Sequence, residues 1–410
     1  MIIHGRVINI EKDSSFLLKR EEKVYRVACL ETRGQAPLSK IALGTIVKCS
    51  GQFKGKLFQV EKIEVLAEPA TDFANYNFQE NWQKATYDPE QIETMQKRAE
   101  ILKLIRQFFH KREFIETETP ILVKYPGQEP YLNPFETKLI SRDGKKEDYY
   151  LITSPEYALK KLLTAGLPRI FEITRSFRNR EENSLTHNPE FTMLEWYRAY
   201  ADYEDIMQDT LNLIKTINQE INGSNKLTYQ GQTYDLDKPL IMTMKEAFRQ
   251  YAGEDLDDYV TGRGQACLAP SRLDALFYNI FMQKIEPELK KIQAPVILKE
   301  YPYFQAALAR KCPKNELYAE RFELYLAGME LANAFSELND AKEQRARFLE
   351  EQSIRKAQGK PILPLDESFL DALSLGMPPA GGIALGIDRL IMLLLDKPDI
   401  KDIITFPIKS

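Results

Sequence analysis

The sequence predicts an α+β protein in which a small β-domain precedes a larger domain built on an antiparallel sheet. Five short strand patterns fill the first 69 residues, and the remainder mixes strands and helices without regular βαβ alternation. The chain of 410 residues also exceeds the size at which one hydrophobic core stops growing. We therefore expect a β-domain at residues 1–69, a linker at 70–87 and a large domain at 88–410.

The β-domain is predicted from alternating apolar and polar residues, as in Phe58, Gln59 and Val60. The expected strands are Ile2–Ile10, Phe16–Arg20, Val24–Leu30, Thr45–Gln52 and Leu57–Leu66. Five strands in so short a stretch favour a small closed barrel of the OB type, a fold that often binds oligonucleotides. Size alone also permits an unrelated β-domain.

The linker at 70–87 is polar and irregular, and its aromatic residues, such as Phe73 and Phe78, are expected to dock on the large domain. Asp88 and Pro89 then predict a helix start, with a capping residue followed by proline in the first turn. Apolar residues recur at helical spacing as far as Phe109. A long amphipathic helix is expected to open the large domain.

Further along, strand and helix patterns alternate irregularly. Extended segments are expected at 149–153, 170–176, 191–199 and 322–325, and helices at 158–165 and 202–221. This irregular mixture favours an antiparallel α+β sheet over a doubly wound one.

Composition excludes several classes of protein. The net charge of −4 argues against a protein that coats nucleic acid through its overall field, although residues 1–69 alone carry +4. No apolar run is long enough to span a membrane, and the N-terminus lacks signal-peptide features, so a cytoplasmic location is expected. The four cysteines and three histidines are scattered, without the spacing of a zinc site.

The segment from Gly381 to Leu395 predicts a glycine-flanked strand that runs into an apolar helix. Arg389 would lie in the first turn of this helix, where free backbone N–H groups favour a phosphate. Taken alone, the segment is equally compatible with a buried helix that carries a surface arginine.

Phe177–Tyr197 predicts two strands joined by a polar loop. The loop would present Arg178 to a phosphate, and the period of two would place Glu195 and Tyr197 on one face of the returning strand. A carboxylate and a phenol oxygen together suit an ammonium group.

Glu320–Leu331 predicts a hairpin that turns near Ala327 and Gly328. Cross-strand geometry would bring Glu323 and Glu330 close together, and two carboxylates repel unless a cation lies between them. Beside a nucleotide this cation would be Mg²⁺. Taken in isolation, the hairpin is better interpreted as a solvated edge.

In combination these segments resemble the three signature motifs of class II aminoacyl-tRNA synthetases. Phe109–Leu122 is similar to the dimer-forming first motif, Phe177–Tyr197 to the second and Gly382–Leu395 to the third. Within that class, His187–Met193 and Ala332–Leu338 resemble the lysine-specific branch. The resemblance covers residues 88–410.

The resemblance implies ATP-dependent formation of a lysyl-adenylate, with Mg²⁺ as cofactor and a homodimer as the assembly. Arg178 would hold the α-phosphate, Arg389 would clamp the terminal phosphates, and Asn188 would lie near the adenine. Glu323 and Glu330 would hold the metal. The remaining residues of the implied ATP site are Asn179, Leu331 and Gly386.

For the amino acid, the resemblance implies that Glu156 receives the α-ammonium group and that Glu195, Tyr197 and Glu337 receive the side-chain ammonium group. The other implied substrate contacts are Ser154, Asn333 and Ala384. Between Asn179 and His187 the chain is one residue longer than the family pattern. The usual glutamate of the second motif therefore stays open among Arg180, Glu181 and Glu182.

Two branches of the family share this active site: lysyl-tRNA synthetases, and enzymes that attach lysine or β-lysine to a lysine side chain of elongation factor P. Ser154, Ala384, Glu195–Arg198 and Gln128–Thr137 resemble the second branch. A small N-terminal barrel resembles a trimmed anticodon-binding domain and favours tRNA. We weight the pocket residues more heavily and expect elongation factor P as acceptor, with tRNA as the alternative.

A third interpretation is a synthetase-like protein that has lost catalysis and regulates or binds other molecules. Such relatives usually lack the phosphate-binding arginines or the metal-binding acids. This chain retains Arg178, Arg389, Glu323 and Glu330, which argues against this interpretation.

Overall fold

A computed structural model describes residues 1–11, 15–29, 41–181, 184–261 and 270–408 of the chain. The chain divides into two compact units. The first contains Met1–Glu100 and Lys401–Pro407, and the second contains Ile101–Ile400 and resumes at Ile408. Among the described residues, no helix has both the length and the apolar character needed to cross a membrane.

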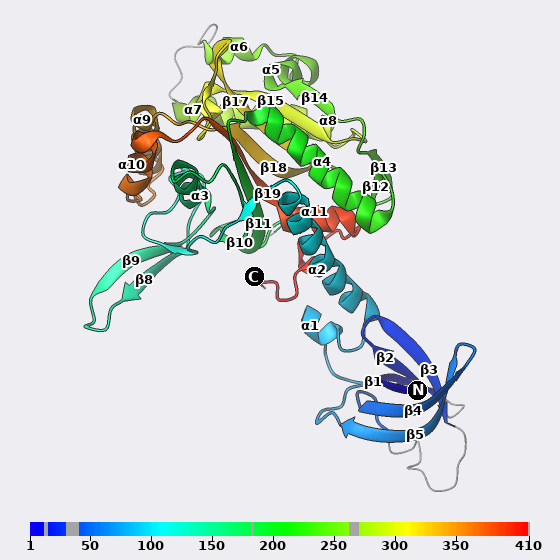
Figure 1. Ribbon diagram of the computed structural model, residues 1–410. Coiled ribbons are helices and arrows are strands. Elements are labelled where there is room, and N and C mark those ends of the chain that lie inside the picture. The colour runs from blue at the N-terminus through cyan, green and yellow to red at the C-terminus, as the bar shows by residue number, and fades with distance from the viewer. Residues whose placement is uncertain (12–14, 30–40, 182–183, 262–269, 409–410) are drawn as a thin grey trace. The chain divides into compact units, whose positions relative to one another are not determined.

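The first unit contains a closed five-stranded barrel with strand order β1-β2-β3-β5-β4 (Figure 1). Its strands are β1 (Ile2–Ile10), β2 (Ser15–Arg20), β3 (Lys23–Cys29), β4 (Ile46–Lys54) and β5 (Leu57–Ala67). Only β3 and β5 pair in parallel among these five strands. Alternate residues such as Val7, Phe16 and Phe58 are completely buried in the barrel core. The barrel fits the expected OB type.

The aromatic residues of the predicted linker pack differently from the expectation. The ring of Phe73 lies against Gly44 of the barrel unit, and the Arg6 guanidinium lies 5.6 Å from its centroid. Phe73 also contacts Phe78, whose ring lies 4.7 Å from that of Tyr87. The prediction that Phe73 docks on the large domain was therefore wrong. Gly44 has no side chain, and this leaves room for the Phe73 ring.

The second unit is built on one large sheet with the order β14-β15-β17-β18-β19-β11-β10-β6, and β16 pairs with β17 at its side. Of the neighbouring strands, β14 and β15 run parallel, as do β10 and β6, and the other pairs are antiparallel. The predicted antiparallel α+β fold is confirmed. The strands are β6 (Ile115–Glu116), β10 (Arg169–Phe177), β11 (Glu190–Ala199), β14 (Leu240–Thr243), β15 (Val296–Pro302), β16 (Lys311–Cys312), β17 (Asn315–Leu326), β18 (Met329–Ser336) and β19 (Ala380–Gly386).

The two faces of this sheet differ in chemistry because successive strand residues point to opposite sides. Leu194 and Trp196 of β11 stand beside Leu385 and Ile383 of β19, and all four are buried. Helices α4 (Tyr203–Asn222) and α11 (Ile387–Leu394) cover this apolar face (Figure 1). The opposite face carries the polar residues of β11 and packs against α3 (Glu156–Thr164).

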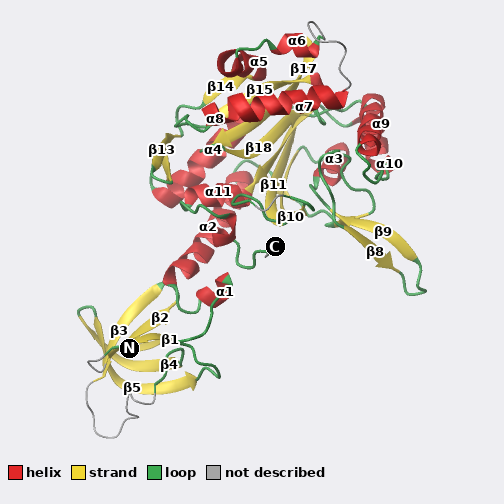
Figure 2. Cartoon of the chain, turned by 180° about the vertical axis from the view of Figure 1, so that it is seen from behind, coloured by secondary structure: helices red, strands yellow, loops and turns green. Residues whose placement is uncertain are grey.

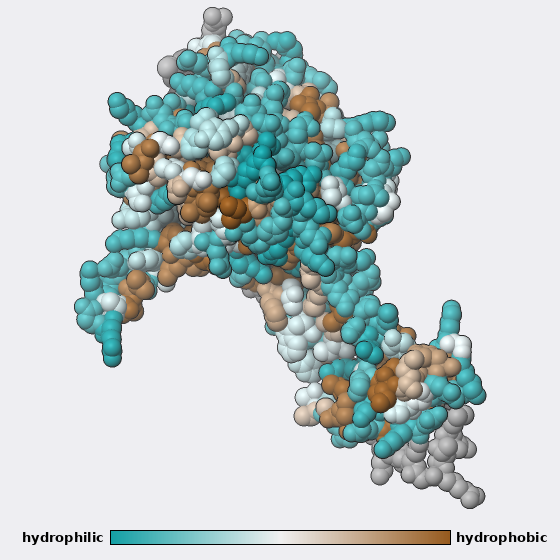
Figure 3. Space-filling view, in the orientation of Figure 1, coloured by the Kyte–Doolittle hydropathy of each residue, from teal (hydrophilic) through white to brown (hydrophobic). Residues whose placement is uncertain are grey.

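A group of further elements completes the two units, and in the second unit the hairpin of β8 and β9 projects from the sheet (Figures 1 and 2). The helices of this group are α1 (Asn81–Lys84), α2 (Pro89–His110), α9 (Ala341–Ala357), α10 (Glu367–Gly376) and α12 (Ile400–Ile403). The strands are β7 (Leu122–Val123), β8 (Glu136–Ile140), β9 (Lys146–Leu151), β12 (Lys226–Tyr229) and β13 (Gln232–Asp235). On the face of the second unit seen in Figure 3, the surface is mainly hydrophilic with small hydrophobic areas, as expected for a water-exposed fold.

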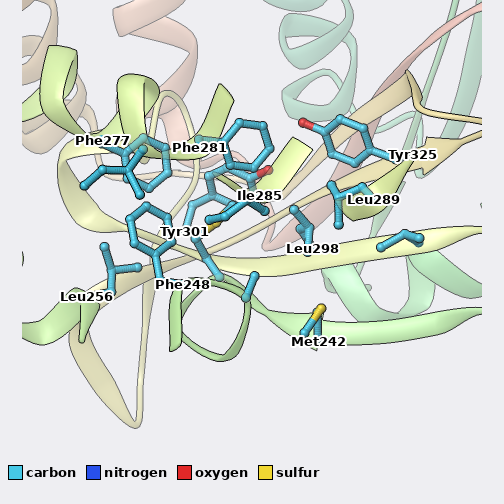
Figure 4. Close-up of a cluster of buried hydrophobic side chains, with 14 of the residues drawn as sticks. Met242, Phe248, Leu256, Phe277, Phe281, Ile285, Leu289, Leu298, Tyr301 and Tyr325 are labelled. Atoms are coloured by element: carbon cyan, nitrogen blue, oxygen red, sulfur yellow. The ribbon is translucent and has the colours of Figure 1, made fainter. Parts of the chain in front are cut away.

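A helical segment between β14 and β15 forms its own apolar layer on the sheet (Figure 4). Phe277 and Phe281 belong to one cluster with Phe248, Leu256 and Leu298 of β15. The segment consists of α5 (Met244–Ala247), η2 (Phe248–Ala252), α6 (Leu256–Val260), α7 (Pro270–Ile280), η3 (Phe281–Ile285) and α8 (Glu286–Leu289), followed after β15 by the short turn η4 (Tyr303–Gln305). This layer fixes the position of α7, which borders the site described below.

Phe109, at the end of α2, ties that helix to the sheet. Its ring is completely buried, stacks on Phe171 of β10 at 4.7 Å and lies 5.1 Å from Trp196 of β11. We expect Phe109→Ala to destabilise the second unit by about 3–5 kcal/mol, through lost burial and a residual cavity. Urea denaturation measures this effect. Phe406→Ala, at a site 68% exposed, is the control, and equal midpoints for the two variants would contradict the prediction.

Candidate active site

A cavity of about 550 Å³ opens on the polar side of the large sheet. Strands β11, β18 and β19 contribute Met193, Asn333 and Ala384 to its wall. Helices α7, α9 and α11 contribute Asp274, Glu351 and Arg389. The volume lies in the ordinary range for sites that bind small molecules and cofactors.

The register of the sheet explains why distant segments meet here. Glu195 stands opposite Ala384, Ala384 opposite Asn333, and Asn333 opposite Glu323, in a row across β11, β19, β18 and β17. Directly opposed residues point to the same face. Four residues that the sequence assigned to one site therefore share one face of the sheet.

Arg178 and Asn188 come from the loop between β10 and β11, and both border the cavity. The Arg178 guanidinium lies 5.1 Å from the centroid of the Phe191 ring. The Asn188 amide donates to the Glu190 carbonyl at 2.5 Å and accepts from the Ile408 N–H at 3.1 Å. Asn179 does not border the cavity as described, and its side chain accepts from the backbone N–H of Arg180.

Arg389 lies in the first turn of α11, as predicted. The helix begins directly after Gly386. Its guanidinium donates to the carbonyl of Glu330 at 2.7 Å and to that of Thr186 at 3.2 Å, and it lies 2.8 Å from His187 Nε2. Leu331 and Gly386 border the same part of the cavity. Arg389 therefore joins three segments around a position where backbone N–H groups can also reach an anion.

The three candidates for the glutamate of the second motif differ in their placement. Glu181 borders the cavity and lies 3.7 Å from His187 Nε2. Arg180 is exposed and has a positive φ of 60°. Glu182 lies outside the described residues. Of the described candidates, Glu181 is the one beside the cavity.

The hairpin of β17 and β18 turns at Ala327 and Gly328, as predicted, and both have positive φ. The two acids lie near each other, as expected, since the charge of Glu323 acts on Glu330. The turn pairs Tyr325 with Glu330, and a bulge between Leu324 and Tyr325 places Glu323 opposite Asn333. The two carboxylates are therefore offset along the hairpin rather than directly opposed.

Glu323 and Glu330 also differ in their partners. The Glu323 carboxylate binds Arg321 at 2.5 Å, Tyr301 at 2.7 Å and Tyr325 at 2.5 Å. Glu330 borders the cavity, and burial together with the charge of Glu323 raises its pKa to about 7.

A cation near Glu330 would lower this raised pKa, because it stabilises the ionised carboxylate. Carboxylate oxygens suit Mg²⁺. Among the described residues, no group of three or more His, Cys, Asp or Glu side chains could hold a metal ion.

A buried polar cluster lies beside the cavity on β11. The Glu195 carboxylate accepts from the Ser154 hydroxyl at 2.6 Å and from the Tyr197 hydroxyl at 2.9 Å. Burial, reinforced by Glu156, raises the pKa of Glu195 to about 8 despite these two hydrogen bonds. The Glu195 carboxyl group at the centre of the cluster would therefore be stabilised in its ionised form by a cationic partner.

The second half of the cluster centres on Lys160 of α3. Its ammonium lies 2.5 Å from Glu156 and 2.6 Å from Glu337, which follows β18. Burial raises the pKa of Glu337 to about 8, although Lys160 opposes the shift. Glu156 and Glu337, which the family assigns to opposite ends of a bound lysine, therefore meet on one internal ammonium group.

Gly382 allows this cluster to form. A Cβ at this position would lie 2.2 Å from Oε1 of Glu337 and 2.3 Å from the Tyr197 ring. Ser154, Glu156, Glu195, Tyr197 and Glu337 do not border the cavity as described, whereas their neighbours Asn333 and Ala384 do.

A group of acids, which we call the acidic wall, borders another part of the cavity. It consists of Glu129, before β8, and of Glu350 and Glu351 on α9. Burial raises the pKa of Glu129, followed by repulsion from Glu156, and burial and Glu129 raise that of Glu351. Oε2 of Glu129 has no hydrogen-bond partner in the described part of the chain.

Several of these residues escaped the sequence analysis. Lys160 stands four residues after Glu156, a helical spacing that predicts an ion pair, and Arg321 shares the period of two with Glu323. Asp274 and the acidic wall gave no comparable signal, because long-range packing alone brings them to the cavity.

Comparison with known proteins agrees with this geometry. The family of tRNA synthetases class II (D, K and N) matches residues 74–410. A protein of Avibacterium paragallinarum named elongation factor P–(R)-β-lysine ligase is 40% identical, over 78% of this chain and 96% of its own length. Lysine–tRNA ligases of Mycoplasma pneumoniae and Cronobacter sakazakii are 40% and 39% identical, over 78% of this chain in each case.

The match covers 66% of the length of the Mycoplasma ligase and 64% of that of the Cronobacter ligase, so the chain spans less than two thirds of these relatives. The family match itself covers nearly the whole region that contains the large sheet and the cavity. The chain belongs to the family of class II tRNA synthetases (D, K and N).

Proposed function

We propose that the protein activates lysine or β-lysine with ATP to form an adenylate and transfers the aminoacyl group to a lysine side chain of elongation factor P. The observation that carries this proposal is the cluster of Glu156, Glu195 and Glu337, three carboxyl groups beside a nucleotide-sized cavity, of which Glu195 and Glu337 are buried. Such a cluster suits an amino acid with two ammonium groups. The relative from Avibacterium, of which the match covers 96%, bears the corresponding name.

In the first step, the carboxylate of the amino acid would attack the α-phosphate of ATP, and pyrophosphate would leave. Arg178 and Arg389 would hold the phosphates in line and neutralise the developing charge, so no general base is needed. Glu330, backed by Glu323, would hold Mg²⁺, which supplies further charge neutralisation on the phosphates. Asn188 would contact the base. Asn179 would contribute to the ATP site without bordering the cavity directly.

In the second step, an amine would attack the aminoacyl carbonyl, and AMP would leave. An acceptor lysine arrives as an ammonium group, and the carboxyl groups of the acidic wall, whose pKa values burial raises, would ionise beside such a cation and hold it. The Ser154 hydroxyl on Glu195 and the Cβ of Ala384 also reshape the pocket relative to the tRNA branch. These features favour the protein acceptor.

The alternative acceptor is tRNA. The closed five-stranded barrel of the first unit supports this alternative, because such barrels bind oligonucleotides, and the relatives from Mycoplasma and Cronobacter are named lysine–tRNA ligases. The division into residues 1–69, 70–87 and 88–410, the homodimer and the cytoplasmic location stay predictions.

Transfer of labelled lysine, and separately of β-lysine, decides between the acceptors. The purified protein receives ATP and Mg²⁺ together with unmodified elongation factor P and tRNA in the same mixture. Label on elongation factor P supports the proposal, and label on tRNA overturns it in favour of the alternative. Label on neither acceptor, with no pyrophosphate released, would mean that the chain has lost catalysis.

The acidic wall generates a prediction about the acceptor step. We expect Glu351→Gln to lower transfer to elongation factor P by about tenfold, because one charge that attracts the acceptor ammonium is lost. Lysine-dependent exchange between ATP and pyrophosphate should stay within about twofold of the unmodified protein. Glu316→Gln, on a largely exposed side chain, serves as the control. A parallel loss of both activities would refute this assignment.

Arg389 is expected to matter before any acceptor arrives. Arg389→Ala should lower ATP–pyrophosphate exchange by about 100-fold or more, because a preorganised charge on the transferring phosphates is lost. Arg142→Ala, at an exposed turn between β8 and β9, should leave the exchange unchanged. Unchanged exchange in Arg389→Ala would sink the role proposed for Arg389.

The pKa values of the buried cluster predict how lysine binding depends on pH. Burial raises the pKa of Glu195 to about 8, so this carboxyl holds its proton at pH 7 while the pocket is empty. Bound ammonium groups favour the ionised carboxylates, and binding therefore releases protons. Affinity should strengthen as the pH rises towards 8, by up to about tenfold per pH unit for each proton released, and then level off.

Calorimetry at pH 7 in two buffers with different ionisation heats measures the released protons directly. Glu195→Gln should release one proton fewer than the unmodified protein. Binding without proton release in the unmodified protein would contradict this picture.

A further inference from the structure

Lys160 is a completely buried cation for which the activation chemistry described above has no use. Its side chain is 0% exposed, and its ammonium lies 2.5 Å from Oε1 of Glu156 and 2.6 Å from Oε2 of Glu337. Burial lowers the pKa of Lys160, but the two carboxylates raise it by more, so the net pKa lies above its ordinary value. The lysine therefore stays charged inside the protein.

The two partners of Lys160 belong to different parts of the fold. Glu156 stands one turn earlier on α3, whereas Glu337 follows β18 and its backbone N–H donates to the carbonyl of Ala380. Without a cation between them these carboxylates would repel, and one of them would take up a proton or turn away. The ion pairs therefore fix the positions of both side chains.

The Glu337 carboxylate keeps one oxygen free of this arrangement. While Oε2 faces Lys160, Oε1 finds no hydrogen-bond donor among the described residues and lies beside Gly382. The Glu337 side chain is 0% exposed, so water does not satisfy this oxygen from outside. An unpartnered buried acceptor of this kind is where an ammonium group of a ligand gains most.

We propose that Lys160 is a positioning residue that determines specificity for an amino acid with two ammonium groups. It holds Glu156 and Glu337 in the orientation that the ligand requires. It also cancels one charge of the three carboxylates Glu156, Glu195 and Glu337. Once the ligand has bound and these groups are ionised, the remaining two negative charges match its two ammonium groups. The inference rests on the proposed function, since it concerns the amino-acid pocket of the same enzyme.

The test compares Lys160→Met with Lys161→Met in the full-length protein. Lys161 is the neighbouring residue on α3, but its ammonium pairs with Asp366 at 2.7 Å and its side chain is 32% exposed. We expect Lys160→Met to raise the KM for lysine in ATP–pyrophosphate exchange by at least about tenfold. The KM for ATP should stay within about twofold, and kcat should fall much less than kcat/KM, because the lost contacts serve ground-state binding of the amino acid. Lys161→Met should match the unmodified protein.

Two further variants separate positioning from folding. Lys160→Arg retains the positive charge and should recover part of the lost lysine affinity. If Lys160→Met does not fold, the double variant Lys160→Met/Glu337→Gln removes both charges of the pair. It should fold while still showing the raised KM for lysine, as checked by thermal denaturation and by calorimetric titration with lysine alone.

The outcomes also distinguish this inference from the proposed function. If the unmodified protein shows no exchange with lysine or β-lysine, the proposed function fails. If the unmodified protein is active but Lys160→Met resembles Lys161→Met, or raises the KM values of lysine and ATP together, the role of Lys160 is overturned. A selective rise for lysine that Lys160→Arg partly reverses supports the inference.

Discussion

The structure depends on keeping several carboxyl groups buried on one face of an antiparallel sheet without letting them repel one another apart. Each of these carboxyl groups is stabilised by different partners. Glu195 accepts two hydroxyl hydrogen bonds, Glu337 faces Lys160, and Glu323 is held by Arg321 and two tyrosines. The raised pKa values of Glu195, Glu330 and Glu337 show that these partners do not fully offset the cost of burying an ionised carboxylate. A cationic ligand would stabilise the ionised carboxylates, and this stabilisation favours its binding.

The rest of the fold serves this face. Leu194 and Trp196 of β11 bury the opposite side under α4 and α11, so the strand that carries Glu195 cannot shift without breaking the core. Phe109 stacks on Phe171 and lies against Trp196, which extends the same core to α2. Rigid strands of this kind hold charged groups more precisely than loops do, and precise placement is what distinguishes a ligand with two charges from one with a single charge.

Much of this arrangement could be read from the sequence. Alternation of apolar and polar residues predicted the barrel strands almost to the residue, and glycine with a helix pattern placed Arg389 in the first turn of α11. The bulge after Leu324 could not be foreseen, because one extra residue in a strand leaves no compositional mark, and it places Glu323 opposite Asn333. Lys160 was within reach, since its spacing from Glu156 predicts an ion pair, whereas Asp274 and Glu351 reach the cavity only through tertiary packing.

Strand β18 is only eight residues long, yet it reaches both the cavity and the buried carboxyl cluster. Glu330 near its beginning accepts Arg389 through its carbonyl, Asn333 borders the cavity in its middle, and Glu337 follows its end. If the cavity binds the nucleotide and the carboxyl cluster binds the amino acid, as proposed, a displacement of this strand would move both sites. Any effect of one ligand on the affinity for the other would then be reciprocal, because thermodynamic linkage requires the same factor in both directions.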